Sequence, residues 1–113
     1  MCTKMESIEI RDEAYVLCKN IFKEKLTDCY LYGSYARGDY HKYSDVDIMM
    51  VVDLDYLGIG QHDDEIADVG SELSLKHGVT VSLKMQPKAI LDQYKDVVPF
   101  YRNVLAEGLR YDG

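Results

Sequence analysis

A glycine–serine pair and a pair of aspartates lie close together in the first half of this 113-residue sequence. Gly33 and Ser34 are followed, after ten residues, by Asp45 and Asp47, and both pairs border stretches typical of strands. Gly33 has no Cβ, so a phosphate group can approach its backbone closely. Ser34 offers a hydroxyl and begins a short helical turn whose free amides attract anions. These residue types at this spacing predict a phosphate-binding site.

The two aspartates predict a site for a divalent cation. Side chains alternate along a strand, so Asp45 and Asp47 point to the same face, about 7 Å apart at the backbone. At an effective dielectric constant of about 20 their charges repel by about 2 kcal/mol, and a bound cation would remove that repulsion. Carboxylates with room for water and phosphate suit Mg²⁺. If the two strands pair antiparallel, the phosphate and metal sites converge.

The elements that must position these residues follow from hydrophobic spacing and capping residues. Thr3 and Glu6 form a capping box that predicts a helix over residues 4–24. The remaining predicted elements are strands at 27–32 and 45–53, a helix from the acidic residues 63–65 to Gly78, a half-buried strand at 79–86, and two helical pieces at 88–95 and 97–107. We therefore expect an α+β fold with a mixed sheet of about three strands flanked by helices, in a single domain over residues 1–113.

Charge and composition narrow the classes of function. A net charge of −7 disfavours direct binding to nucleic acid and suits a metal-dependent site or a basic protein partner. No apolar run approaches the ~18 residues of a membrane helix, and the N-terminus lacks the apolar core of a signal peptide, so we expect a cytoplasmic protein without membrane contact. Cys2, Cys18 and Cys29 have neither disulfide nor metal-ligand spacing, which predicts free thiols.

The segment GSYARGDYHKYSDVDIMMVV resembles the core motif of the nucleotidyltransferase superfamily, which includes the palm of DNA polymerase β. At this length the chain is similar to a minimal nucleotidyltransferase (MNT). The resemblance implies that Gly33 and Ser34 hold a nucleoside triphosphate and that Asp45 and Asp47 ligate Mg²⁺. It also implies that an acceptor hydroxyl attacks the α-phosphate and pyrophosphate leaves.

Two further positions bear on this resemblance. Arg37 is a candidate for compensating the phosphate charge, and the alternative is a surface arginine paired with Asp39. Active members of the superfamily carry a third carboxylate on the next strand, and the residue that aligns with it here is Ser82. A hydroxyl is a weak neutral ligand, and nearby Lys84 adds positive charge, so we expect weak binding of a second metal.

The preferred function is Mg²⁺-dependent transfer of a nucleoside monophosphate, AMP from ATP, to a hydroxyl. MNT relatives act as antitoxins that adenylylate a HEPN-type toxin, so a HEPN-type partner is expected by resemblance. The alternative is a catalytically impaired nucleotide-binding or antitoxin module that lacks the third carboxylate at Ser82. An antibiotic-modifying transferase fits less well, because such relatives use an added helical domain.

Other patterns are better explained by structure. The sequence HDDE at residues 62–65 resembles a phosphohydrolase metal motif but lacks the further histidines, and it is typical of a helix start. Tyr40 and Tyr43, in the segment between the two motifs, can either stack on a nucleotide base or pack against the fold. Val97, Tyr101, Val104 and Leu105 predict a buried stripe on the last helix.

Overall fold

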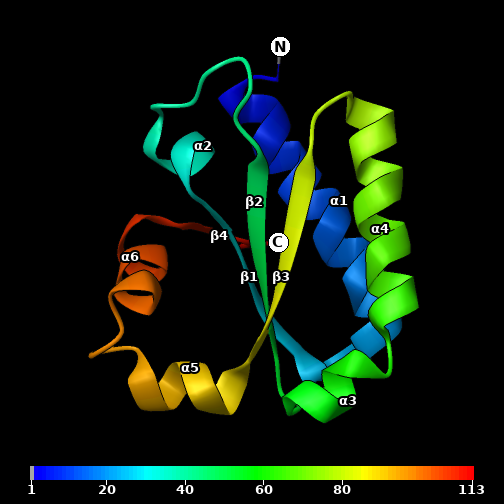
Figure 1. Cartoon of the computed structure of the whole chain (residues 1–113), viewed down its shortest axis with the longest axis vertical. Coiled ribbons are helices and arrows are strands. Elements are labelled where there is room, and N and C mark those ends of the chain that lie inside the picture. The colour runs from blue at the N-terminus through cyan, green and yellow to red at the C-terminus, as the bar shows by residue number, and fades with distance from the viewer. Residues whose placement is uncertain (1) are drawn as a thin grey trace.

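The computed structural model describes residues 2–113 as a mixed sheet flanked by helices (Figure 1). In chain order the elements are α1 (Lys4–Phe22), the 3-10 turn η1 (Lys23–Lys25), β1 (Leu26–Tyr32), α2 (Ser34–Arg37), β2 (Val46–Val52), α3 (Tyr56–Gly60), α4 (Asp63–His77), β3 (Val81–Pro87), α5 (Lys88–Tyr94), α6 (Pro99–Glu107) and β4 (Leu109–Arg110). The predicted α+β class is confirmed.

The strands lie in the order β3-β2-β1-β4. β1 pairs antiparallel with both β2 and β4, whereas β2 and β3 are parallel and are joined by a crossover that contains α3 and α4. The antiparallel pairing of β1 and β2 puts Tyr32, the last residue of β1, opposite Asp47. The predicted convergence of the two strand ends therefore occurs.

The long helices begin and end where their sequences indicate. Thr3 Oγ1 accepts a hydrogen bond of 3.1 Å from the amide of Glu6, which caps α1. α1 stops at Lys23, whose φ of +54° ends the helical geometry. α4 begins with three acidic residues and ends at Gly78, which has a φ of +64° and donates its amide to the carbonyl of Ser74.

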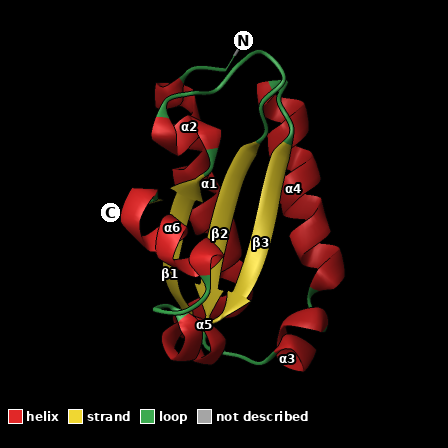
Figure 2. Ribbon diagram, turned by 60° about the vertical axis from the view of Figure 1, so that its left-hand side comes forward, coloured by secondary structure: helices red, strands yellow, loops and turns green. Residues whose placement is uncertain are grey.

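Helices lie on both faces of the sheet, with α1 and α4 on one side and α5 and α6 on the other (Figure 2). A hydrophobic cluster lies on each side. The larger one packs alternate residues of β2, such as Ile48 and Met50, against α1 and α4. The smaller one packs Met49 and Val51 of β2 against Leu91 of α5 and Val104 of α6. Because side chains alternate along β2, Asp47 lies in the row of Met49 and Val51 and faces the side of α5 and α6.

The structure differs from the sequence-based expectation in three elements. A fourth strand, β4, was not predicted because its two residues are too short to show an alternating pattern. The segment after β2 forms the short helix α3, with the Asp55 carboxylate accepting from the amide of Gly58 at 2.8 Å. The predicted stripe on α6 is wrong at its ends, since Val97 lies before the helix and is 68% exposed and Leu105 is 37% exposed.

The three cysteines are free and buried, as their spacing predicted. Burial raises the pKa of the Cys18 and Cys29 thiols to about 12. Within residues 2–113, no helix combines the length and apolar character needed to cross a bilayer.

Candidate active site

Gly33 and Asp47 are in direct contact at the joined ends of β1 and β2. Gly33 follows Tyr32 and has a φ of +76° and a ψ of −155°, a backbone conformation that is essentially restricted to glycine. A Cβ atom at this position would overlap Oδ2 of Asp47. The structure thus brings the glycine of the first motif against a carboxylate of the second, and no other residue type fits between them.

Ser34 begins the single turn of α2, directly after Gly33. The amide of Arg37 bonds the carbonyl of Gly33 at 3.1 Å, and the amide of Gly38 bonds the carbonyl of Ser34 at 2.8 Å. Tyr35 and Ala36 are buried and anchor the turn in the larger cluster, which leaves Ser34 partly exposed and Arg37 exposed. The sequence folds this way because its apolar and polar residues are sorted to opposite sides of one turn.

The two aspartates differ in environment. Asp45 lies just before β2 and is exposed, whereas Asp47 is partly buried beside Gly33. Burial, and then the charge of Asp45, raise the pKa of Asp47, and the charge of Arg37 opposes this shift. The pair therefore carries negative charge that the surrounding protein does not fully compensate, which is the electrostatic setting of a cation site.

Arg37 lies beside this pair and also contacts surface acids. Its Nε donates to Asp39 at 3.3 Å, and its guanidinium is 4.0 Å from the carboxylate of Glu107 on α6. Both interpretations of Arg37 are therefore compatible with its position, since it forms the surface pair and its charge reaches Asp47. Exposed pairs of this kind hold an arginine only weakly, so it can turn toward a bound anion.

Ser82 lies directly beside Asp47, because the parallel register of β2 and β3 pairs these two residues. Its side chain is exposed at the position where the resemblance places a third carboxylate. Lys84 follows on the same face, with its ammonium 5.6 Å from the ring centroid of Phe100 on α6. β3 thus contributes the neutral hydroxyl of Ser82 at the site and the positive charge of Lys84 at its border.

The donor set fits one hard divalent cation. In the part of the chain that the structure describes, no three histidine, cysteine or acidic side chains gather as a metal cluster. Asp45 and Asp47 supply two adjacent carboxylates, and the exposed hydroxyl of Ser82 leaves room for water. Mg²⁺ is commonly held by one or two carboxylates with several waters retained, so these residues suit it.

A small pocket adjoins the site on the side of α6 and has a volume of about 220 Å³. Phe100 forms part of its wall and packs edge-on against Tyr32, with ring centroids 5.5 Å apart. The pocket is lined by Tyr32, Gly33, Arg37, Phe100, Asn103, Val104 and Glu107. Sequence analysis missed the α6 residues, because they follow the motif by more than fifty positions and show no pattern that ties them to it.

Tyr40 and Tyr43, between the two motifs, lie in different environments. Tyr40 stacks on Tyr35 with ring centroids 4.4 Å apart, and its hydroxyl accepts from the amide of Lys4, so it packs against the fold. Tyr43 is 78% exposed and belongs to the segment that leads to Asp45. Packing thus accounts for Tyr40 but not for Tyr43.

Comparison with known proteins places the chain in a family. The model of the nucleotidyltransferase domain matches residues 17–111. "Putative protein adenylyltransferase MJ0604" of Methanocaldococcus jannaschii is 36% identical over 90 residues, which are 80% of this chain and 82% of that protein. "Putative protein adenylyltransferase MJ0141" of the same organism is 37% identical over 97 residues, which are 86% of this chain and 96% of that protein.

Two solved structures share the fold. A toxin–antitoxin crystal structure with AMP-PNP matches with a TM-score of 0.58 and 23% identity, over 91% of this chain and 73% of that one. A mutant of the toxin–antitoxin MntA-HpeT matches with a TM-score of 0.56 and 18% identity, over 99% and 74% of the two chains. The match of the domain model over most of the chain, together with relatives more than 30% identical, shows that this chain belongs to the nucleotidyltransferase domain family.

Proposed function

We propose that this chain transfers AMP from ATP to a hydroxyl group of a partner protein, with Mg²⁺ held by Asp45 and Asp47. The observation that supports the proposal is the contact between Gly33 and Asp47, which brings the two motifs together. Both similar proteins of Methanocaldococcus jannaschii carry the name "Putative protein adenylyltransferase", which supports the substrate class. The toxin–antitoxin neighbour with AMP-PNP supports an adenine nucleotide.

Each residue of the site has a role that follows from its position. Gly33 gives phosphate oxygens close access to the backbone where α2 begins, and Ser34 adds a hydroxyl donor. Arg37 balances phosphate charge when it leaves its weak surface pairs. Asp45 and Asp47 would hold the cation, which would supply charge neutralisation on the phosphate oxygens.

The proposed transfer forms one bond to the α-phosphorus and breaks another. The acceptor oxygen forms a bond to the α-phosphorus, and the bond between this phosphorus and the bridging oxygen of the β-phosphate breaks. Pyrophosphate leaves with that oxygen, and the proton of the acceptor hydroxyl passes to solvent. No carboxylate on β3 is placed to accept this proton, because Ser82 occupies the position beside Asp47. Removal of a general base typically lowers a rate by ~10²- to 10⁴-fold, so we expect slow turnover.

Ser82 also supports a second candidate function. A chain with the phosphate and metal groups of Gly33, Ser34, Asp45 and Asp47 can bind a nucleotide without transferring it, and can act as an antitoxin by contact alone. In either case the expected partner, by the family resemblance, is a HEPN-type toxin.

The test uses ATP labelled at its α-phosphate or its γ-phosphate, with Mg²⁺ and a candidate HEPN-type partner protein. Transfer predicts label on the partner from α-labelled ATP only, lost in Asp45→Asn and kept in the matched control Asp53→Asn at the opposite end of β2. Mg²⁺-dependent ATP binding and neutralisation of the partner without label would favour the binding module. Absence of ATP binding would refute both functions.

A further inference from the structure

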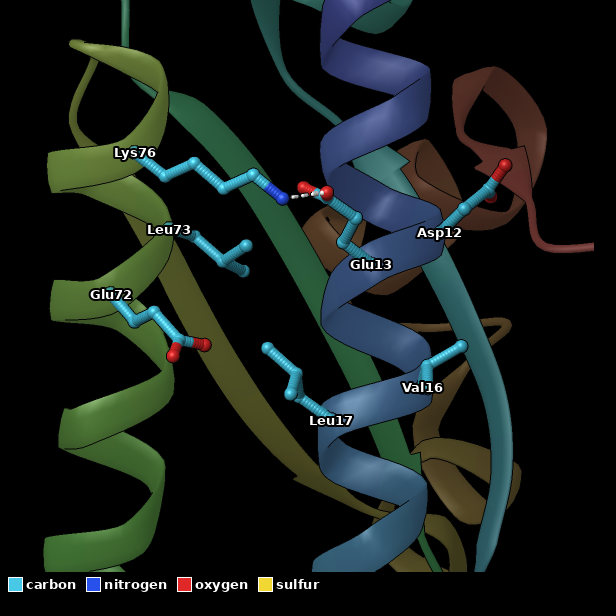
Figure 3. A pocket seen from close by; sticks show the side chains of 7 residues that line it. All are labelled: Asp12, Glu13, Val16, Leu17, Glu72, Leu73 and Lys76. Carbon is cyan, nitrogen blue, oxygen red and sulfur yellow. Dashed lines mark hydrogen bonds and ion pairs between the residues drawn. The ribbon is translucent and has the colours of Figure 1, made fainter.

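A second hollow, of about 520 Å³, lies between α1 and α4 (Figure 3). Leu17 and Leu73 point toward each other across its floor, and Leu73 is only 1% exposed. Val16 stands at the rim with 56% of its surface exposed. We call this hollow, lined by Asp12, Glu13, Val16, Leu17, Glu72, Leu73 and Lys76, the α1–α4 groove.

The groove is closed at one end and open at the other. Lys76 reaches across from α4 and pairs with Glu13 of α1 at 2.5 Å, and His77 bonds the second oxygen of the same carboxylate at 2.5 Å. Glu72 lies one turn below Lys76 and directs its carboxylate toward the open part. α1 and α4 pack against each other over the same hydrophobic core, so the apolar floor is a preformed feature.

The two helices that form the groove carry most of the net negative charge of the chain. α1 and α4 together contain nine acidic residues and four lysines or arginines, which gives −5 of the net −7. An apolar floor inside an acidic surface repels phosphates and also repels a second copy of the same face. It attracts a partner with an apolar stripe bordered by positive charge.

The groove is separate from the candidate active site. α1 and α4 pack on the sheet face of Ile48 and Met50, whereas Asp47 lies in the row that faces α5 and α6. A ligand in the groove therefore leaves the candidate active site at Gly33 and Asp47 open. None of the motif residues lines the groove.

We propose that the α1–α4 groove is a docking site for a cationic amphipathic helix of a partner protein, which inserts aliphatic side chains over Leu17 and Leu73 beside Val16. A helix fits because two adjacent helices present a longitudinal groove that a third helix fills with residues spaced by one turn. Lysines or arginines flanking the inserted residues meet Glu72, whose carboxylate points toward the groove, whereas Asp12 is already paired with Arg11. The docked helix lies behind the sheet, so a hydroxyl that enters the active site belongs to another part or another copy of the partner. The docking site relies on the proposed function only for the existence of a protein partner.

The first experiment measures binding of a synthetic helical peptide to the full chain by fluorescence anisotropy, without ATP or Mg²⁺. The peptide has leucines at heptad a and d positions and lysines elsewhere, and its control has glutamates in place of the lysines. We expect saturable binding of the lysine peptide, weakened by salt, and no binding of the glutamate peptide. Equal binding of the two peptides would overturn the proposal.

Two matched variants separate docking in the groove from general attraction to an acidic protein. Val16→Glu and Leu75→Glu add the same charge at exposed apolar positions, but Leu75, 85% exposed, lies outside the groove. Val16→Glu should lower the affinity for the lysine peptide about 10-fold or more, and Leu75→Glu should leave this affinity unchanged. Binding to Val16→Glu as tight as to the wild type, with unchanged circular dichroism, would refute docking in the groove. Because no nucleotide is present, the result is independent of whether the chain transfers AMP.

Discussion

Replacement of Gly33 by alanine tests whether the contact of the two motifs makes the site. The backbone of Gly33 has a φ of +76°, and a Cβ there would overlap the carboxylate of Asp47. Gly38, at the other end of α2, has a φ of +91° but no atom within 4 Å of an added Cβ. The two glycines therefore share a positive φ and differ in their contact with the aspartate, so Gly38→Ala is the control for backbone strain.

The expected magnitudes follow from this difference. A positive φ costs a non-glycine residue about 1–3 kcal/mol, so both variants should lower the free energy of unfolding. Gly33→Ala should lower it more, because its ψ of −155° is essentially restricted to glycine and its Cβ would overlap Asp47. Only Gly33→Ala must also move the Asp47 carboxylate, by a distance on the order of an ångström. A misplacement of that size can lower a rate about 100-fold, so we expect a loss of this order in Gly33→Ala and little loss in Gly38→Ala.

The assay combines urea unfolding, followed by circular dichroism, with Mg²⁺-dependent AMP-PNP binding and transfer from α-labelled ATP. Unfolding data correct for the fraction of folded protein, so a remaining difference between the variants reports on Asp47. Equal binding and transfer in the two variants would refute the argument that the contact of Gly33 with Asp47 forms the site.

Three further predictions concern β3, the thiols and the ion pair between α1 and α4. Ser82→Asp should restore a third carboxylate beside Asp47, lower the Mg²⁺ concentration for half-maximal transfer and raise the rate up to about 100-fold, whereas the uncharged Ser82→Asn should give no gain. Cys18 and Cys29 should react with a thiol reagent only on unfolding, because burial raises their pKa to about 12; rapid modification of both in the folded protein would contradict this. The hydrogen bond from Lys76 lowers the pKa of Glu13, so ionised Glu13 stabilises the fold above its ordinary pKa of 4.5 and this contribution is lost as pH falls through the lowered value. Glu13→Gln should therefore cost up to about 1 kcal/mol at neutral pH, since the pair is partly exposed, and almost nothing in strong acid, as measured by urea unfolding across pH.

Most elements could be predicted because their boundaries are marked locally. Thr3 caps α1, Gly78 ends α4, and the Gly33 and Asp47 motifs flank two buried strands, so no long-range information was needed. β4 could not be predicted in this way. Its two residues are held by distant partners, such as the bond of Arg110 to Asp28 at 2.7 Å, which leave no periodic signal in the sequence.

The candidate site likewise has one part that the sequence predicts and another part that it does not. Residues 33–47 form a local pattern, and antiparallel pairing is the only assumption needed to bring Gly33 next to Asp47. The wall provided by α6 and the approach of Glu107 to Arg37 depend on how the chain returns to the sheet after β3. Such contacts are set by tertiary packing, so residue types and spacing in the sequence do not reveal them.

The layout of the site has a consequence for how the protein can change. Gly33, Ser34, Asp45 and Asp47 lie on one contiguous segment, whereas the position beside Asp47 that decides on a third acid lies more than thirty residues further along the chain, on β3. On our proposal, residues 33–47 bind the nucleotide, whereas the residue at position 82 on β3 determines how fast the transfer proceeds. A substitution at Ser82 alone can change the rate of transfer without disturbing the residues that hold the nucleotide.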